Sequence, residues 1–559
     1  MAAHAAPSRQ SLQEFGYADV QLTGGPLKRQ YDHLHQHFLS LDNERLLKVY
    51  RQRAGLPAPG EDMGGWYDAD GFVPGHTIGQ YISGLSRYAG ATGDAATIAK
   101  VRALVEGYAA TLGPDDYPYA SKKADTTWPC YILDKYEIGM IDACRLAGVK
   151  QAGEVLSRVI RGAIPHIPDH TYDRGPDSPK QAPYDEPYIL PENLFNSYEL
   201  TGERKFLEMA KLYLLNDLYF DPLAQGRNLL PGKHAYSHVI ALSSAAKAYE
   251  VLGDEKYLKA IRNAWDMLEQ TQEFASGGWG PKEAFVPPNQ GKLGESLTTT
   301  RDHFETPCGA YAHTKLARYL IRFTAEGCYG DGLERIIYNT ILGSLNPGED
   351  GQYFYYSDYQ SGATKGYYKR KWPCCSGTLV QGVADYPLGL YFRRADSLFV
   401  NMFAPSRLKW TAGRTPVTVT QTTNYPKEES SELRVDVPAS VEFTMQIRIP
   451  GWLKTQSRIE VNGKSVDVAA QPGSFAAIRR KWNKGDTVEV RFPMGFRPAP
   501  VDDQHPALAA VMRGPVMYVA ANPPSGFDGS LRIAGKPEIP LQPFYETGRE
   551  TYTTYFDIR

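Results

Sequence analysis

The sequence lacks any long apolar run, and its charges nearly cancel. No stretch approaches the ~18 consecutive apolar residues that cross a membrane, so no membrane partner is predicted. Lysine and arginine together number 61 and aspartate and glutamate 63, which gives a net charge of −2. A protein that binds nucleic acid presents a basic face to the phosphates, so this balance argues against a nucleic-acid partner.

Cysteine is scarce, and the amino terminus has no leader pattern. Six cysteines in 559 residues are too few for a disulfide scaffold. Two of them, Cys374 and Cys375, are adjacent, which favours reduced thiols that bind a metal or act as a nucleophile. Residues 1–10 carry neither the basic nor the apolar segment of a signal peptide. The protein is therefore expected in the cytoplasm, or in the periplasm or outside the cell if a leader was removed.

What the sequence does contain is a recurring helix–turn–helix signature in residues 1–395. A glycine, usually followed by an acidic residue, ends one amphipathic stretch and opens the next. It occurs at Gly93, Gly148, Gly202, Gly253 and Gly330. A period of ~50 residues corresponds to one pair of helices with its loop. With an opening pair before residue 90, the pattern predicts six pairs that close into an (α/α)6 barrel. An open helical solenoid is the alternative.

Residues 396–559 show a different period. Apolar and polar residues alternate along 443–449, which is typical of a strand with one buried face. Asn462-Gly463 lies between two further alternating stretches and is a strong hairpin turn signal. Short strands at this spacing predict an antiparallel β-sandwich after the helical part.

The segment 304–308 places a carboxylate and a thiol at the start of a helix. Thr306 suits an N-cap and Pro307 the first helical position, so Cys308 is expected in the first turn. A thiol there has a lowered pKa, because free N–H groups and the helix dipole stabilise the thiolate. Glu305 lies just outside the same turn.

These two residues and the adjacent cysteines form a candidate metal site. Three thiolates and one carboxylate, from Cys308, Cys374, Cys375 and Glu305, match the ligands of tetrahedral zinc. The plainer alternative has the cysteines as small buried hydrophobic residues and Glu305 as a surface cap.

A second carboxylate lies in the long interval between Gly253 and Gly330. Glu283 belongs to the Gly- and Pro-rich segment 278–285, which predicts a loop between helices. Such a loop can carry an acid into the mouth of a helical barrel. The alternative is an ordinary solvated glutamate.

Together these segments resemble glycoside hydrolase family 127, the β-L-arabinofuranosidase type. The matching motifs are Gly-Gly-Trp-Gly with Glu283-Ala-Phe, Glu305-Thr with Cys308, Cys374-Cys375, Gly75-His76 with Gly79 and Tyr81-Ile-Ser83, and Arg513-Gly514-Pro515-Val516. They follow one another in the family's order over nearly the whole chain. The resemblance implies an (α/α)6 barrel followed by β-sandwich material, in agreement with the two periods described above.

The resemblance also implies catalytic and metal-binding roles. Glu305, Cys308, Cys374 and Cys375 would bind Zn²⁺, Cys374 would be the nucleophile, and Glu283 would be the general acid/base. A thiolate that attacks the anomeric carbon, followed by water that releases the sugar, retains the anomeric configuration.

Substrate contacts are implied less directly. His234 falls where family members present a substrate-contacting histidine, and His238 is the nearby second candidate. His76, in the matching Gly75-His76 motif, and Tyr355, shortly before the cysteine pair, are further candidates. Each histidine has a core role as its alternative.

Two departures from the family pattern concern spacing and specificity. Thr306-Pro307 puts two residues between the glutamate and the first cysteine, where relatives have one. Asp134 stands where many relatives carry histidine. In the pocket it would accept hydrogen bonds and repel acidic sugars, so the preferred substrate is expected to differ from that of simple β-L-arabinofuranosidases and to be neutral there. The alternative is a surface aspartate paired with a neighbouring lysine.

The sequence therefore predicts a zinc-dependent, retaining exo-glycosidase. Its substrate would be an oligosaccharide or glycoconjugate with a terminal L-arabinofuranose or similar small sugar, and a homodimer is left open. One alternative is a polysaccharide lyase or epimerase on an α/α toroid, which could recruit His234, Tyr236 and Asn193. The other is a sugar-binding protein with a closed structural zinc site.

Overall fold

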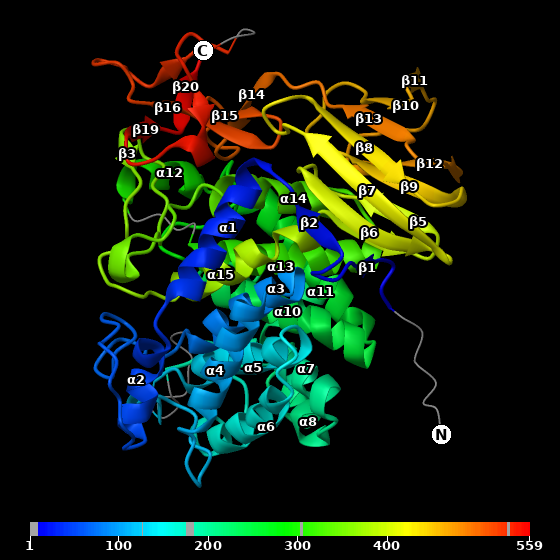
Figure 1. The fold of residues 1–559 in the computed structure, drawn as a ribbon. Coiled ribbons are helices and arrows are strands. Elements are labelled where there is room, and N and C mark those ends of the chain that lie inside the picture. Colours follow the sequence, from blue (N-terminus) through cyan, green and yellow to red (C-terminus); the bar gives the residue numbers. More distant parts are fainter. Residues whose placement is uncertain (1–8, 126, 175–183, 302–305, 534–536) are drawn as a thin grey trace.

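The structure is a computed structural model that describes residues 9–125, 127–174, 184–301, 306–533 and 537–559. Helices dominate up to about residue 390 and strands dominate beyond it (Figure 1). Among the described residues, no helix combines the length and the apolar character that crossing a membrane requires.

Six helices form a closed inner ring. They are α3 (Ile78–Thr92), α5 (Pro129–Arg145), α7 (Pro191–Thr201), α10 (Ala235–Leu252), α13 (Pro307–Thr324) and α15 (Cys375–Ala384). Each packs against the next in this order, and α15 packs against α3. The ring buries apolar side chains on all sides of its helices, for example Ile82 and Val380. The predicted (α/α)6 barrel is confirmed, and the open solenoid is excluded.

An outer layer covers this ring. It consists of α1 (Gly25–Ser40), α4 (Ala95–Ala109), α6 (Gln151–Ala163), α8 (Arg204–Leu212), α11 (Glu255–Thr271) and α14 (Cys328–Ile336). Each of the last five packs on the inner helix that precedes it in the chain. The exception is α1, which packs on α15, although these two helices lie at opposite ends of the helical part of the sequence. The predicted opening pair is therefore wrong in detail, because α2 (Asn43–Arg53) packs on α4 instead.

Most of the predicted turn glycines cap helices. Gly93, Gly202 and Gly253 end α3, α7 and α10 in the left-handed region, with φ of 66°, 76° and 78°. The prediction for Gly330 is wrong, because this residue lies inside α14 and the preceding helix ends at Ala325, with φ 61°. Gly330 has a different reason to be glycine: a Cβ there would lie 2.2 Å from the Asn401 side-chain oxygen.

Two sheets form the sandwich. The first has the order β1 (Gln13–Glu14), β4 (Tyr391–Arg394), β5 (Ser397–Val400), β9 (Val441–Ile449) and β12 (Ser474–Trp482). The second has the order β11 (Lys464–Ser465), β10 (Arg458–Val461), β13 (Thr487–Arg491), β8 (Ser430–Asp436), β7 (Thr415–Thr423), β6 (Ser406–Ala412) and β2 (Val20–Leu22). Trp410 of β6 meets Phe443 of β9 between them, with ring centroids 5.1 Å apart.

The sandwich confirms the prediction from the alternating pattern. Its pairings are antiparallel except that β5 runs parallel to β9. Val461 pairs with Lys464 across the predicted hairpin turn, in which Asn462 and Gly463 have positive φ of 52° and 72°. Both residues in the left-handed region give the tight two-residue turn that Asn-Gly favours.

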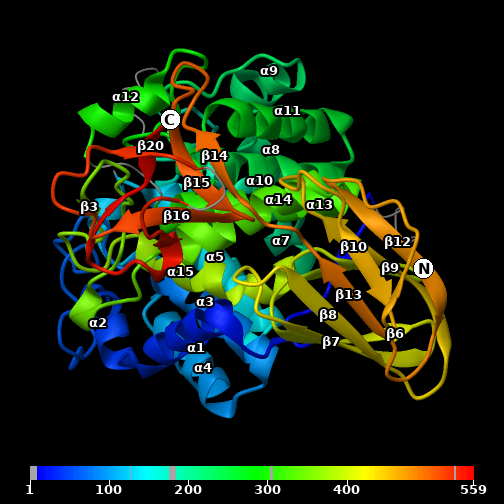
Figure 2. The ribbon, with the colours of Figure 1, turned by 90° about the horizontal axis from the view of Figure 1, so that it is seen from above.

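A third sheet lies against the helical barrel (Figure 2). Its order is β17 (Ser530–Leu531), β20 (Tyr555–Ile558), β15 (Leu508–Arg513), β16 (Val516–Ala521), β19 (Thr551–Thr553) and β3 (Ala363–Thr364), with β14 (Phe496–Pro500) beside β15 and β18 (Gln542–Pro543) beside β16. Because β3 precedes the cysteine pair, this sheet holds the segment that leads to it. The predicted division at residue 395 stays a prediction, and all three sheets include strands from before it.

Candidate active site

The amino-terminal ends of the inner helices surround a cavity of about 490 Å³. For each inner helix, its lining includes a residue within five positions of the helix start: Val73, Trp128, Glu186, His234, Cys308 and Cys374. Helix N-termini carry partial positive charge and free N–H groups, which favour anions. The barrel therefore directs an anion-stabilising field into this cavity, which is called the N-terminal cavity below.

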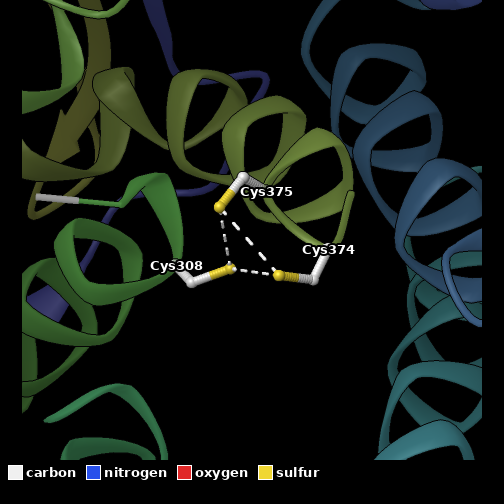
Figure 3. Close-up of side chains that lie close together, drawn as sticks. All are labelled: Cys308, Cys374 and Cys375. Carbon is white, nitrogen blue, oxygen red and sulfur yellow. Dashed lines mark hydrogen bonds between the residues drawn. The ribbon is translucent and has the colours of Figure 1, made fainter. Parts of the chain in front are cut away.

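Three cysteine thiols lie close together (Figure 3), and two of them, Cys308 and Cys374, line the cavity. The Cys308 sulfur lies 3.5 Å from that of Cys374 and 3.5 Å from that of Cys375, and the last two are 4.0 Å apart. Zn–S bonds of about 2.3 Å in a tetrahedron separate the sulfurs by about 3.8 Å. The three side chains therefore fit one face of a zinc coordination sphere. The fourth predicted ligand, Glu305, lies outside the described residues.

Local structure aims these thiols at one another. Thr306 caps α13 by accepting a hydrogen bond from the Gly309 N–H at 3.1 Å, and Pro307 is the first helical residue, as predicted. Cys308 thus lies in the first turn of α13. Cys374 immediately precedes α15 and Cys375 begins it. Two helix N-termini converge on the cluster, which stabilises thiolate.

The three thiols differ in acidity. Hydrogen bonds from the Cys308 and Cys375 thiols hold the pKa of Cys374 well below its ordinary value. Burial raises the pKa of both Cys308 and Cys375. The first thiol to ionise is therefore Cys374, which also lines the cavity.

Glu283 lies in the same cavity and is connected to Cys374 through a tyrosine. The Tyr355 hydroxyl donates to Glu283 Oε1 at 2.8 Å and lies 3.9 Å from the Cys374 sulfur. Tyr356 donates to the other carboxylate oxygen at 3.4 Å. Burial raises the pKa of Glu283, so this carboxyl holds its proton to higher pH than a solvated glutamate. The structure thus brings together Glu283, Tyr355 and Cys374 from three separate segments.

The backbone is strained at three places around this cavity. Trp128, Glu283 and Trp372 are not glycine, yet they have φ of 66°, 60° and 50°. Each such residue costs about 1–3 kcal/mol, and residues of this kind concentrate at functional sites. Trp372 lies two residues before Cys374, and its indole N–H donates to the Met63 carbonyl at 2.7 Å. No sequence signal announces these conformations, because the surrounding fold imposes them.

The predicted histidines occupy different environments. His234 lines the cavity, and its Nδ1 lies 3.4 Å from Glu186. His238 is fully buried behind it and binds Asp173 at 3.0 Å, so it does not reach the cavity. His76 is also buried, with Nδ1 2.6 Å from the Val73 carbonyl, and burial lowers its pKa to about 4.

Asp134 is not among the residues that line the cavity. It is buried on α5, where its carboxylate accepts a hydrogen bond from the Asn193 side-chain amide at 2.8 Å. Burial raises its pKa to about 6. The surface position considered for Asp134 is thus excluded. The hydrogen bond to Asp134 also fixes the side chain of Asn193, which the lyase alternative would recruit. Tyr236 does line the cavity.

Several cavity residues were not singled out from the sequence. An aromatic group is formed by Trp66, Phe72, Trp128, Tyr131, Tyr356 and Tyr368. Charged side chains come from Arg174, Glu186, Lys369 and Arg370. Burial by itself would raise the pKa of Glu186. The Arg174 guanidinium lies 2.5 Å from the carboxylate and outweighs this effect, so the pKa of Glu186 is below its usual value. The tyrosine doublets near the cysteine pair, 355–356 and 367–368, were the available signal.

The fold and the cavity define a class of protein: an (α/α)6 barrel with an acid and a thiol cluster at one end, followed by antiparallel sheets. Within it, the chain belongs to glycoside hydrolase family 127. The family's β-L-arabinofuranosidase catalytic domain matches residues 19–388, and its middle domain matches residues 397–494. The resemblance stated from the motifs is confirmed.

Individual relatives are distant in sequence. The chain is 21% identical over 381 residues to the non-reducing end β-L-arabinofuranosidase of Bifidobacterium longum subsp. longum, a match that covers 58% of this chain and 55% of the relative. It thus spans about half the length of this relative. A solved family 127 β-arabinofuranosidase shares 20% identity over 98% of both chains, with a TM-score of 0.79. The family 127 β-L-arabinofuranosidase of Geobacillus stearothermophilus T6 shares 18% identity over 97% of this chain and 100% of its own, with a TM-score of 0.72.

Proposed function

We propose that this protein is a zinc-dependent, retaining exo-glycosidase that releases a terminal L-arabinofuranose or similar small sugar from an oligosaccharide or glycoconjugate. The observation that carries the proposal is the placement of Cys374 and Glu283 in one cavity, joined through the Tyr355 hydroxyl. A nucleophile and an acid on the same substrate are what a two-step retaining glycosidase needs. Family membership and the activity named for the Bifidobacterium relative support the choice of sugar.

The thiol cluster supports the choice of zinc. Cys308, Cys374 and Cys375 would hold the ion, and Glu305 is the fourth ligand that the family resemblance implies. When bound, zinc keeps coordinating thiols deprotonated at neutral pH. The spacing of the three sulfurs suits tetrahedral coordination, and their burial excludes competing water.

In the first step, the Cys374 sulfur attacks the anomeric carbon and forms a C–S bond. The bond between that carbon and the glycosidic oxygen breaks, and Glu283 gives its proton to the departing oxygen. The raised pKa of Glu283 suits this role, because the carboxyl keeps its proton to higher pH than a solvated glutamate does. Tyr355 and Tyr356 hold its carboxyl group in place by hydrogen bonds to both oxygens.

In the second step, water replaces sulfur at the anomeric carbon. Glu283, now a carboxylate, takes a proton from the water, and the C–S bond breaks to restore the Cys374 thiolate. Two inversions at the same carbon give net retention. Glu186 lines the cavity beside Arg174, and its carboxylate suits acceptance of a hydrogen bond from a sugar hydroxyl.

The test combines a substrate screen with zinc analysis. p-Nitrophenyl glycosides, led by the β-L-arabinofuranoside, should reveal turnover, and NMR should show the product anomer with retained configuration. Elemental analysis should find about one zinc per chain. Cys308→Ser and Cys375→Ser should each lower it, whereas Cys328→Ser, an exposed cysteine outside the cluster, should not.

Other outcomes separate the alternatives. Sugar binding without turnover would favour the binding protein with structural zinc. Turnover that produces an unsaturated sugar and is unaffected by thiol alkylation would favour the lyase. Full zinc occupancy in both cluster variants would remove the proposed ligands.

A further inference from the structure

Two cations in the N-terminal cavity have no acidic partner among the described residues. Lys369 and Arg370 line the cavity and are exposed, and neither forms an ion pair in the part of the chain that the structure describes. The next residue, Lys371, does pair with a carboxylate, that of Asp350. The remaining cavity cation, Arg174, is neutralised by Glu186 at 2.5 Å. Uncompensated positive charge is therefore confined to the Lys369-Arg370 segment.

This segment lies on the side of the cavity where the leaving group must be. The proposed acid, Glu283, has to touch the glycosidic oxygen, so the leaving group lies next to Glu283 and Tyr355. The Tyr368 ring stacks on the Tyr355 ring with centroids 4.6 Å apart and planes at 27°. Arg370 follows Tyr368 by two residues, and its positive charge opposes part of the rise in the Tyr368 pKa that burial causes. Stacked tyrosines thus connect the acid to the two cations.

The same side offers a surface for a sugar ring. Tyr356 and Tyr368 line the cavity beside Glu283, and their rings lie 6.1 Å apart at an angle of 67°. Aromatic side chains present an apolar face and a polar edge, which suits a sugar with both C–H and hydroxyl groups. A guanidinium and an ammonium at the end of this surface select for negative charge, because both donate hydrogen bonds and neither accepts one.

We infer that the leaving-group subsite, formed by Tyr356, Tyr368, Lys369 and Arg370, recognises a sugar that carries an anionic group, a carboxylate or a sulfate ester. This inference rests on the proposed function and names the chemistry on the far side of the cleaved bond. The natural substrate would then be a small neutral sugar attached to an acidic sugar of a polysaccharide or glycoconjugate. The neutral specificity predicted from Asp134 applied to the part of the substrate that this side chain would meet, and Asp134 does not line the cavity.

Transfer to added acceptors tests the subsite without knowledge of the natural linkage. A retaining enzyme can pass its sugar to an acceptor bound in the leaving-group subsite instead of to water. With p-nitrophenyl β-L-arabinofuranoside as donor, we would compare methyl galactosides that differ only at C6: a carboxylate, a sulfate ester and the free alcohol. Transfer product and inhibition of hydrolysis would be measured for each. The anionic acceptors should exceed the alcohol by about tenfold at low salt, and 0.5 M NaCl should remove most of this preference.

Charge reversal provides the matched variants. Lys369→Glu combined with Arg370→Glu should invert the preference in favour of the alcohol, and the milder Lys369→Gln with Arg370→Gln should abolish it. Lys484→Glu combined with Arg414→Glu makes the same change in net charge on exposed turns of the β-sandwich and should leave the preference intact. Comparison of the carboxylate with the sulfate ester identifies the anion that the subsite prefers.

The result that overturns the inference is equal transfer to all three acceptors, or none, by a wild-type enzyme that hydrolyses the donor. A preference that persists unchanged in the reversal variant would also overturn it. If the reversal variant does not fold, the glutamine pair and the salt dependence of the wild type decide the question. Failure to hydrolyse any donor would contradict the proposed function instead, so the two failures are distinct.

Discussion

The two ends of the inner ring of helices differ in chemistry. At the amino-terminal end lies the cavity with Cys374 and Glu283. At the carboxyl-terminal end lies a second cavity, of about 290 Å³, called the C-terminal cavity here. Its lining includes four arginines, each of which forms an ion pair with an acid: Arg87, Arg145, Arg318 and Arg322. Arg87 lies 3.0 Å from Asp142 and 3.0 Å from Asp385.

This difference follows from the direction of the helices. All six inner helices point their N-termini toward the first cavity, so their dipoles favour anions there and cations at the opposite end. The C-terminal cavity satisfies its arginines with aspartates and glutamates and thereby ties neighbouring helices together. The N-terminal cavity instead leaves a thiol cluster, a carboxyl group with a raised pKa and two cations available to a ligand. We therefore expect substitutions at the first end to affect turnover and those at the second to affect stability.

The largest expected effect is that of Cys374→Ser. Serine is not deprotonated at neutral pH, so kcat should fall by about 10⁴-fold or more. Steady-state kinetics with p-nitrophenyl β-L-arabinofuranoside measure this, and a cyclophellitol-type inhibitor should label the wild-type peptide that contains Cys374. Cys328→Ser is the matched control. Labelling of a carboxylate instead of a thiol would contradict the nucleophile assignment and would reduce the contrast between the two ends.

The next effect is that of Glu283→Gln. The glutamine amide oxygen can still accept the hydrogen bond from Tyr355, but the side chain carries no transferable proton, so kcat should fall by about 10²–10⁴-fold. Because burial raises the pKa of Glu283, wild-type activity should decline on the alkaline side as this carboxyl loses its proton. The pH profile of kcat/KM should lose that limb in the variant. Glu432→Gln, on the exposed face of β8, is the control and should leave the pH profile unchanged. If the alkaline decline in kcat/KM persists in Glu283→Gln, it belongs to another group.

At the C-terminal cavity, Arg87→Met should act on stability alone. Arg87 is buried and pairs with Asp142 and Asp385, so its removal leaves buried carboxylates short of a partner. We expect a loss of about 3–5 kcal/mol in the free energy of unfolding, read from urea titration. Arg145→Met, at a more exposed position of the same cavity, should change it by less than about 1 kcal/mol. A fall in kcat/KM of the folded Arg87 variant would show that the two ends are coupled.

The smallest expected effect concerns Asp134, which lies between the two cavities along α5. Its folded-state pKa of about 6 is above the value of 3.8 for an ordinary aspartate. The stabilisation that this group provides is therefore present at low pH and is lost as pH rises through about 6. The full difference corresponds to about 3 kcal/mol, of which about 1.4 kcal/mol is lost between pH 5 and pH 7.5, because the unfolded aspartate is already ionised at pH 5. Asp134→Asn should lack this loss, so unfolding free energies of the two proteins at pH 5 and pH 7.5 should diverge.

The same variant also tests the specificity prediction for this residue. If Asp134 acts only through stability, the relative kcat/KM for different sugars stays as in the wild type. A changed ratio would mean that Asp134 influences the N-terminal cavity after all. Both proteins would be compared below their unfolding temperatures, so that loss of folded enzyme does not imitate a change in preference.

Local patterns were sufficient for the architecture. The glycine turns and the change of period near residue 395 predicted the barrel and the sandwich, since a left-handed cap needs glycine and a half-buried strand needs alternation. The exceptions have tertiary causes. Gly330 is required by contact with Asn401, and α1 pairs with α15 because closing a ring brings the two ends of the helical part together.

The candidate site divides along the same line. By itself, the sequence determined which thiols and which acid form the site, because their motifs are continuous in the chain and resemble those of one family. Only the tertiary structure decided that Tyr355 bridges Glu283 and Cys374, that His234 reaches the cavity while His238 does not, and that Asp134 faces Asn193. These relations join residues far apart in sequence, and a helical residue faces the ring interior or its neighbour according to packing angles that no local pattern encodes.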